Sequence, residues 1–292
     1  MAACSSRDDD DDTATESGGD GGGGGSASID TEDCGADPTQ EIEGNTLKLV
    51  SSFPQSGLTA AFSEIARGWK AYFQMMNEEE GGVTLAGEQY TVEFDDRDDE
   101  YNAAETSSNI EELVGDDGSD AFATFSVVGT ANNIAIRDFL GDLCVPDVFA
   151  ATGSPAWGNP DYPWLIGSTL PPYSLEGQRF AQLLEEEDPD ATVAMLVQDD
   201  DFGRAYEEGF RQAIEDTDIE VVAVEKYPTG ASEVAAQVTS LASSDATAFF
   251  NGATLLACPD ALTRVQESNW EPLTWVSGTC ISKTLMGIAG AA

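Results

Sequence analysis

Short apolar segments alternate with amphipathic helical segments from residue 46 to residue 278, and this alternation constrains the fold more than any other feature. Parallel strands need a crossover of a dozen or more residues between them, usually a helix, so the pattern predicts an α/β fold with parallel sheets. Strands are expected at 46–50, 90–96, 121–128, 145–152, 162–168, 191–197, 219–227, 246–251 and 273–278. Helices are expected at 58–76, 102–114, 131–140, 174–187, 203–216, 231–243 and 259–268.

The alternation stops and restarts near residues 167–174, within the stretch GSTLPPYS. Two successive runs of strands and helices predict two Rossmann-like, doubly wound lobes. We place the first lobe at residues 45–170 and the second at residues 171–292.

Residues 1–44 contain almost no large apolar side chain and are rich in Asp and Gly, so they are predicted to form a disordered tether. The start MAAC resembles the end of a lipobox, which makes Cys4 a candidate lipidation site. The basic and apolar regions of a signal peptide should precede such a site, and we interpret Met1 as an internal residue of that peptide. An ordinary amino terminus with a chance cysteine is the alternative.

The net charge of the chain limits the classes of partner that it can bind. The formal net charge is −43, from 55 acidic and 12 basic residues without any histidine, and phosphates would be repelled. Nucleic acid and anionic lipid are therefore not expected as partners. The acidity fits a high-salt habitat, in which salt screens self-repulsion, or a lineage that favours acidic surfaces.

The cysteines predict disulfide bonds rather than a metal site. With Cys4 lipidated, four cysteines remain, which in an exported protein suggests two bonds and allows three pairings. We expect Cys258–Cys280, which follow consecutive strands, and Cys34–Cys144. No CxxC spacing or histidine supports zinc, and no metal or cofactor is expected.

Catalytic motifs are absent from the sequence. Without histidine there is no Ser-His-Asp or Cys-His pair, and no phosphate-binding glycine motif follows a strand. The acidic runs at 95–100 and 199–201 lack the spacing of a calcium loop and are interpreted as solvated or helix-capping residues. We therefore do not expect an enzyme.

A binding site is expected beyond the carboxyl ends of the strands, where open parallel sheets bind ligands. The segments there are rich in glycine and hydroxyl residues, and several lead into helices whose free N–H groups favour an anion. The candidate donors are Ser51, Ser52, Thr130, Thr152 and Ser154. Each of these turns also needs glycines and N-cap residues for structural reasons alone.

Several segments carry a resemblance to a known family. The stretches FPQSGLTAAFSEIARGWKAYFQMMNEEEGGV, FSVVGTANNIAIRDFL, CVPDVFAATGSPAWGNPDYPW and QDDDFGRAYEEGFRQAI resemble the type I periplasmic-binding-protein family. The likeness is to its leucine/isoleucine/valine-binding proteins of ABC importers and runs from about residue 46 to residue 286. Members on cell surfaces are often lipoproteins. The chain ends before the elements with which the family closes both lobes, so it looks truncated at the C-terminus.

The resemblance implies an amino acid bound between the lobes. By position, Thr130 and Thr152 would meet its carboxylate, and the carbonyl oxygen of Ala150 would accept from its ammonium group. Phe202 stands where the family often has tyrosine. Cys280 stands near the place of the family's acidic ammonium partner, which leaves Asp199 or Asp200 as substitutes. Aromatic walls are expected from Tyr101, Trp157 and Phe202.

Two functions fit this resemblance. The first is an extracytoplasmic lipoprotein that delivers a branched-chain amino acid, or a similar small apolar carboxylate or amide, to an ABC permease. It would be anchored to the outer face of the cytoplasmic membrane through lipid only. The second is the ligand-binding sensor domain of a signalling receptor with the same fold.

Overall fold

The structure is a computed structural model that describes Cys34, residues 44–168 and residues 170–290. Cys4 and almost all of the predicted tether lie outside the described residues. The predicted boundaries at 44/45 and 170/171 remain predictions.

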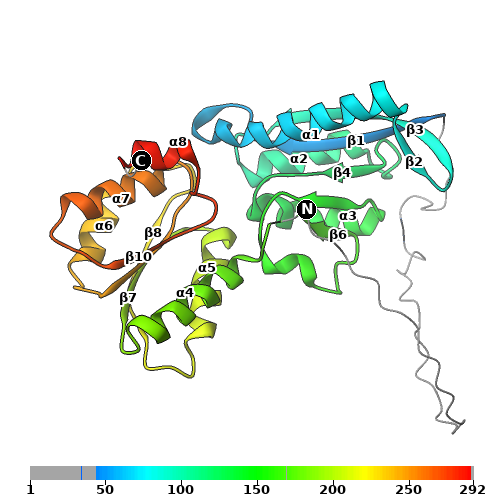
Figure 1. Ribbon diagram of the computed structural model, residues 1–292. Coiled ribbons are helices and arrows are strands. Elements are labelled where there is room, and N and C mark those ends of the chain that lie inside the picture. Colours follow the sequence, from blue (N-terminus) through cyan, green and yellow to red (C-terminus); the bar gives the residue numbers. More distant parts are fainter. Residues whose placement is uncertain (1–33, 35–43, 169, 291–292) are drawn as a thin grey trace, which may run out of the picture. The chain divides into compact units, whose positions relative to one another are not determined.

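The first sheet has six strands in the order β2-β3-β1-β4-β5-β6 (Figure 1). Their bounds are β1 Thr46–Phe53, β2 Val83–Leu85, β3 Glu88–Asp98, β4 Ala123–Phe125, β5 Asp147–Ala150 and β6 Leu165–Gly167. The strands from β3 to β6 pair in parallel, as predicted.

Strand β2, which the sequence analysis did not predict, pairs antiparallel with β3 at the edge of this sheet. Ala86 and Gly87 join the two strands, with φ values of 52° and 90°. Positive φ at both central residues is the geometry of a tight two-residue hairpin turn. The sequence analysis missed this hairpin, since alanine is not a usual residue at the first of these positions.

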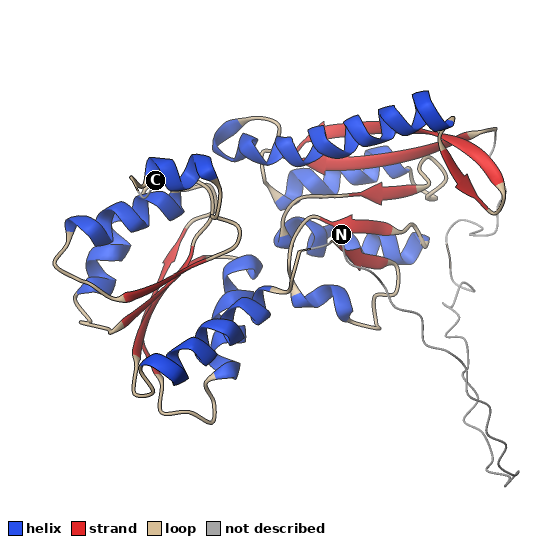
Figure 2. Ribbon diagram, viewed as in Figure 1, coloured by secondary structure: helices blue, strands red, loops and turns tan. Residues whose placement is uncertain are grey.

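Helices cover both faces of the first sheet (Figure 2). On one face lies α1 (Ser63–Met75), preceded by the 3₁₀ turn η1 (Gly57–Phe62) and followed by the π turn η2 (Met76–Glu80). Its Trp69 packs on Phe94, with ring centroids 4.3 Å apart. On the other face, α2 (Ala103–Val114) and α3 (Thr130–Leu143) bury Ile110, Ile136 and Leu140 against Val50.

Strands β4, β5 and β6 are shorter than predicted. The expected strand over 121–128 is interrupted at Ser126, whose φ is 58°, and continues only as an isolated bridge from Val128 to Ala151. Hydrophobicity marks all of this segment as buried but does not report where the backbone leaves the sheet. The short turn η3 (Pro155–Gly158) lies between β5 and β6.

The second sheet has four parallel strands in the order β10-β9-β7-β8. They are β7 Thr192–Gln198, β8 Glu220–Tyr227, β9 Ala248–Gly252 and β10 Leu273–Val276. Helices α4 (Tyr173–Glu187) and α5 (Asp201–Ala213) pack on one face around Phe180, Phe210 and Phe250. Helices α6 (Ala235–Ala242) and α7 (Ala257–Glu267) pack on the other around Phe249 and Trp270 (Figure 1). Helix α8 (Lys283–Ile288), which the sequence analysis did not predict, contacts α7.

Two disulfide bonds are present, Cys34–Cys144 and Cys258–Cys280. Their Cα atoms are 5.3 and 6.1 Å apart, within the range that a disulfide needs. Both pairs coincide with those expected from the sequence. The second bond ties the start of α7 to the segment after β10, because β9 and β10 are neighbours in the sheet.

Candidate ligand-binding site

A hollow of about 500 Å³ lies at the carboxyl ends of strands of both sheets. From the first sheet it is lined by the start of η1, by the segment after β3 and by the first turn of α3. From the second it is lined by Asp200 after β7 and by Thr229 and Gly230 after β8. This is the edge at which parallel α/β sheets bind ligands.

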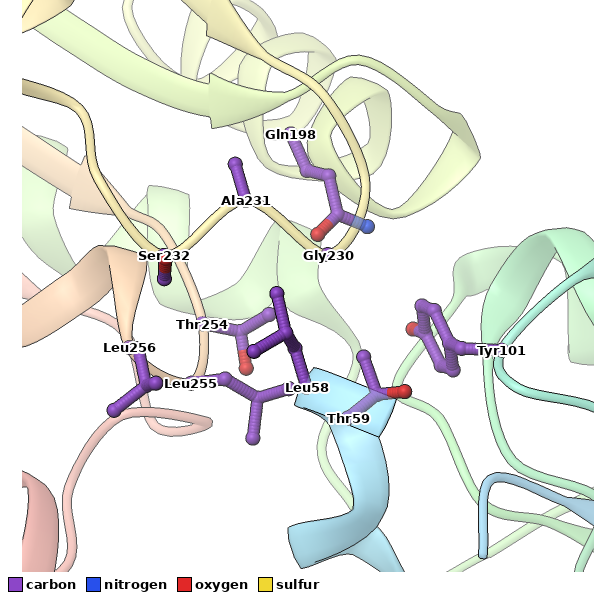
Figure 3. A pocket seen from close by; sticks show the side chains of 10 residues that line it. All are labelled: Leu58, Thr59, Tyr101, Gln198, Gly230, Ala231, Ser232, Thr254, Leu255 and Leu256. Carbon is purple, nitrogen blue, oxygen red and sulfur yellow. The ribbon is translucent and has the colours of Figure 1, made fainter. Parts of the chain in front are cut away.

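A smaller pocket of about 10 Å³ adjoins this hollow and shares Leu58, Thr59, Tyr101 and Gly230 with it (Figure 3). It adds polar groups from Gln198, Ser232 and Thr254, and the apolar side chains of Leu255 and Leu256. In Figure 3, Leu58 and Thr59 rise from η1 between Tyr101 on one side and the residues of the second sheet on the other. The two pockets together form the region that we call the cleft.

Tyr101 is held in the cleft by a strained turn. Glu100 and Tyr101 both have positive φ, 49° and 65°, which non-glycine residues seldom adopt. The buried carboxylate of Asp99 supports the turn by accepting from the Tyr101 amide N–H at 2.9 Å. Its other oxygen accepts from the hydroxyls of Ser52 at 3.0 Å and Thr106 at 2.9 Å.

Burial raises the pKa of Asp99, and the hydrogen bonds from Tyr101, Thr106 and Ser52 oppose that rise. Burial also raises the pKa of Tyr101 well above its usual value, and the charge of Asp200 adds to the effect. The phenol therefore stays neutral and can both donate and accept a hydrogen bond. Its ring lies against Phe62, with centroids 5.5 Å apart.

The second sheet contributes Asp200 and Thr254. Asp200 caps α5 by accepting from the Gly203 amide N–H at 3.1 Å, and it also accepts from Gln198 Nε2 at 2.6 Å. Burial is the largest cause of its raised pKa. The Thr254 amide N–H donates to the Tyr227 hydroxyl at 3.1 Å. The buried Oγ1 of Thr254 has no hydrogen-bond partner among the described residues.

The candidates Thr130, Thr152 and Ala150 bond to one another or to nearby backbone rather than lining the cleft. The Oγ1 atoms of Thr130 and Thr152 are 2.6 Å apart, and Thr152 Oγ1 lies 3.0 Å from the Tyr173 hydroxyl. The Ala150 carbonyl accepts from the amide N–H groups of Thr152 at 2.8 Å and Ser168 at 3.1 Å. These groups connect the starts of α3 and α4, and their direct contact with a ligand stays a prediction.

Ser51 is buried, and its Oγ has no hydrogen-bond partner among the described residues. The remaining candidates have partners within the protein. Ser52, buried, supports Asp99, and Ser154 Oγ accepts from the Ala156 amide N–H at 3.2 Å. Phe202 is buried against Tyr173 and Tyr206, with centroids 5.0 and 5.3 Å away. Cys280 is buried in its disulfide bond. The indole N–H of Trp157 donates to the Thr152 carbonyl at 2.9 Å.

The sequence analysis named the right loops but few of the residues that line the cleft. It included Tyr101 and Asp200, and it missed Leu58, Thr59, Gln198 and Thr254. Gln198 lies directly after a predicted strand and Thr254 in the loop after another, whereas Leu58 and Thr59 fall at the start of the helix predicted at 58–76 and lie in η1. The sequence could show that a residue lies near the end of a strand. The direction in which its side chain points is known only from the folded structure.

Two sheets of this construction, with a polar pocket at the carboxyl ends of their strands, define a ligand-binding protein of the α/β class. The chain belongs to the periplasmic binding protein family, whose model matches residues 46–292. Membership implies an extracytoplasmic location and confirms the resemblance noted in the sequence. Within the described residues, no helix combines the length and apolar character needed to cross a bilayer.

Solved structures show the same fold. A substrate-binding periplasmic protein from Ralstonia solanacearum is 24% identical, with a TM-score of 0.72, over 84% of this chain and 67% of that protein. A branched-chain amino acid ABC transporter protein from Thermus thermophilus with bound valine is 20% identical, with a TM-score of 0.71, over 84% of this chain and 62% of its own.

A fatty acid ABC transporter substrate-binding protein from Thermomonospora curvata is 18% identical, with a TM-score of 0.72, over 85% of this chain and 61% of its own. This chain thus spans 61–67% of the length of the three structures. Among curated protein sequences, none matches it.

Proposed function

We propose that the protein is the solute-binding component of an ABC importer, without enzymatic activity, and that its ligand is a branched-chain amino acid or a similar small apolar carboxylate or amide. The composition of the cleft carries this proposal. Leucine side chains lie beside hydroxyl groups and beside the carboxylates of Glu100 and Asp200, and no lysine or arginine is among the lining residues.

Each part of an amino acid has a counterpart in this lining. The carboxylate of Asp200 supplies an acceptor for the ammonium group, and Leu58, Leu255 and Leu256 supply contacts for an apolar side chain. The hydroxyls of Thr59 and Thr254 are donors for a carboxylate. Two similar structures, described as a branched-chain amino acid ABC transporter with bound valine and as a fatty acid ABC transporter substrate-binding protein, support transport over the sensor function.

The test is calorimetry with leucine and with 4-methylpentanoate, which lacks only the amino group, at about pH 8. We expect leucine to bind about tenfold more tightly than 4-methylpentanoate, because only leucine has an ammonium group that can donate to Asp200. Asp200→Asn should remove most of this preference. The control is Asp199→Asn, since the Asp199 side chain is 68% exposed and is not among the lining residues. Tighter binding of 4-methylpentanoate would reject the amino acid and leave an apolar carboxylate.

We also propose that Cys4 is lipidated and holds the protein on the outer face of the cytoplasmic membrane, through a tether formed by residues 5–44. Two acyl chains give stable anchoring where one chain is marginal. Expressed behind a complete signal peptide, the protein is expected to enter the detergent phase on phase separation, and Cys4→Ser should leave it in the aqueous phase. The same distribution for both forms would refute the anchor.

A further inference from the structure

A second cavity, of about 300 Å³, lies on the opposite edge of the first sheet from the cleft. It adjoins Asp147 and Leu165, the first residues of β5 and β6, and so it lies at the amino ends of these strands. The other lining residues used below are Arg137, Asp138, Leu140 and Asp142 of α3, and Asp161 and Tyr162 before β6. The cavity shares no lining residue with the cleft.

Asp147 provides a buried acceptor that the protein leaves unused. Its side chain is 1% exposed, and Oδ1 accepts from Thr124 Oγ1 at 2.8 Å. The buried Oδ2 has no hydrogen-bond partner among the described residues. Burial raises the pKa of Asp147 to about 7, with Thr124 opposing the rise. A buried carboxylate oxygen without a donor is costly, which makes it a strong acceptor for any donor that enters.

The charges around Asp147 favour a cation. Helix α3 contributes Arg137, Asp138 and Asp142, and the segment before β6 contributes Asp161 and Tyr162. The single arginine already has two partners within this lining: its guanidinium lies 3.7 Å from the centroid of the Tyr162 ring, and its Nε lies 3.4 Å from Asp138 Oδ1. Four carboxylates therefore face one arginine, in a chain of net charge −43.

The rest of the cavity suits an organic cation better than a metal ion. Leu140 and Leu165 are buried apolar side chains that adjoin it, and Tyr162 adds an aromatic ring. Within the described part of the chain, no group of three or more Asp, Glu, Cys or His side chains could hold a metal ion. One buried carboxylate with apolar neighbours matches a ligand that has one positively charged end and an apolar remainder.

We propose that this cavity binds a small primary ammonium compound with a short apolar stem. Its N–H group donates to Asp147 Oδ2, and the stem lies against Leu140 and Leu165. The exposed acids raise the local concentration of cations but do not contact the ammonium group. This site is independent of the function proposed for the cleft.

The probe is n-butylammonium, with tetramethylammonium and sodium at equal ionic strength as controls. Carboxyl ¹³C NMR measures the pKa of Asp147 itself in the unaltered protein. We expect saturating butylammonium to lower that pKa by about one unit, which corresponds to about a tenfold preference for the ionised carboxylate. Tetramethylammonium has no N–H donor and should leave the pKa nearly unchanged. An equal shift with tetramethylammonium or sodium would show a general cation effect and overturn the proposal.

Calorimetry supplies the second measurement. The affinity for butylammonium should rise between about pH 6 and pH 8, as Asp147 ionises, and Asp147→Asn should weaken it about tenfold and abolish its pH dependence. Asp142→Asn, at an exposed position beside the cavity, should change it by less than about twofold. Unchanged binding in Asp147→Asn would refute the site. Competition by leucine would place butylammonium in the cleft and would also count against it.

Discussion

Gly209→Ala is expected to cost about 3 kcal/mol or more of the free energy of unfolding, because α4 and α5 pack too closely for any side chain there. A Cβ atom on Gly209 would lie 2.4 Å from the Ser174 Cα and 2.7 Å from its Cβ. On the facing helix, a Cβ atom on Gly177 would lie 2.7 Å from the Phe210 amide nitrogen. These neighbours are backbone or Cβ atoms, so the helices themselves must separate and the core around Phe180 and Phe210 must open.

The control is Gly68→Ala, in the exposed middle of α1. A Cβ atom there meets no atom within 4 Å, and alanine favours the helix, so we expect a gain of up to about 1 kcal/mol. Urea unfolding followed by circular dichroism measures both variants. Equal stability of the two would show that α4 and α5 do not pack at this distance.

Asp147→Asn is expected to stabilise the protein at about pH 8 and to have little effect at about pH 4. Burial raises the pKa of Asp147 from its usual 3.8 to about 7, so the folded protein binds this proton more tightly than the unfolded chain does. Ionising the group therefore opposes folding. Its cost is absent below the unfolded pKa, grows as the pH rises through this window, and is complete above about 7.

The size of the gain in stability from Asp147→Asn follows from the difference between the folded and unfolded pKa values of Asp147. A difference of this magnitude corresponds to about 4 kcal/mol at most, and we expect a gain of about 2–4 kcal/mol for the asparagine variant at high pH. Asparagine keeps an oxygen to accept from Thr124 but carries no charge. Unfolding of the wild-type protein and of Asp147→Asn at a series of pH values measures the difference in their free energies of unfolding. The other carboxylates titrate in both proteins, so their contribution cancels in this difference.

Asp142→Asn serves as the control for removing one negative charge near the same cavity. Because Asp142 is exposed, its removal should change stability by less than about 0.5 kcal/mol at either pH. A gain from Asp147→Asn of the same size at low and high pH would mean that folding does not raise the pKa of Asp147.

Local signals in the sequence predicted most of the fold. The periodicity of apolar residues located every strand from β3 to β10, β1 and the main helices, since burial on one or both sides of a sheet imposes it directly. The same signal failed for β2, where the turn at Ala86 and Gly87 decides the pairing, and for the end of β4, where the backbone of Ser126 leaves the sheet. Both features are backbone conformations that hydrophobicity does not encode.

For the candidate site, too, the sequence predicts some features and not others. The two-sheet α/β class and the loops at the carboxyl edge follow from the sequence alone, because chain order and parallel pairing place those loops there. The side chains that face the cleft are known only from the folded protein. In the structure, Thr130 and Thr152 form a hydrogen bond with each other, and Phe202 is buried in a core. Thr254 Oγ1 has no hydrogen-bond partner among the described residues. Such contacts join elements that are far apart in the chain, so the sequence does not reveal them. Asp147 likewise reads as one acid among 55 in the sequence, and its buried, half-paired carboxyl arises from packing between β4, β5 and α3.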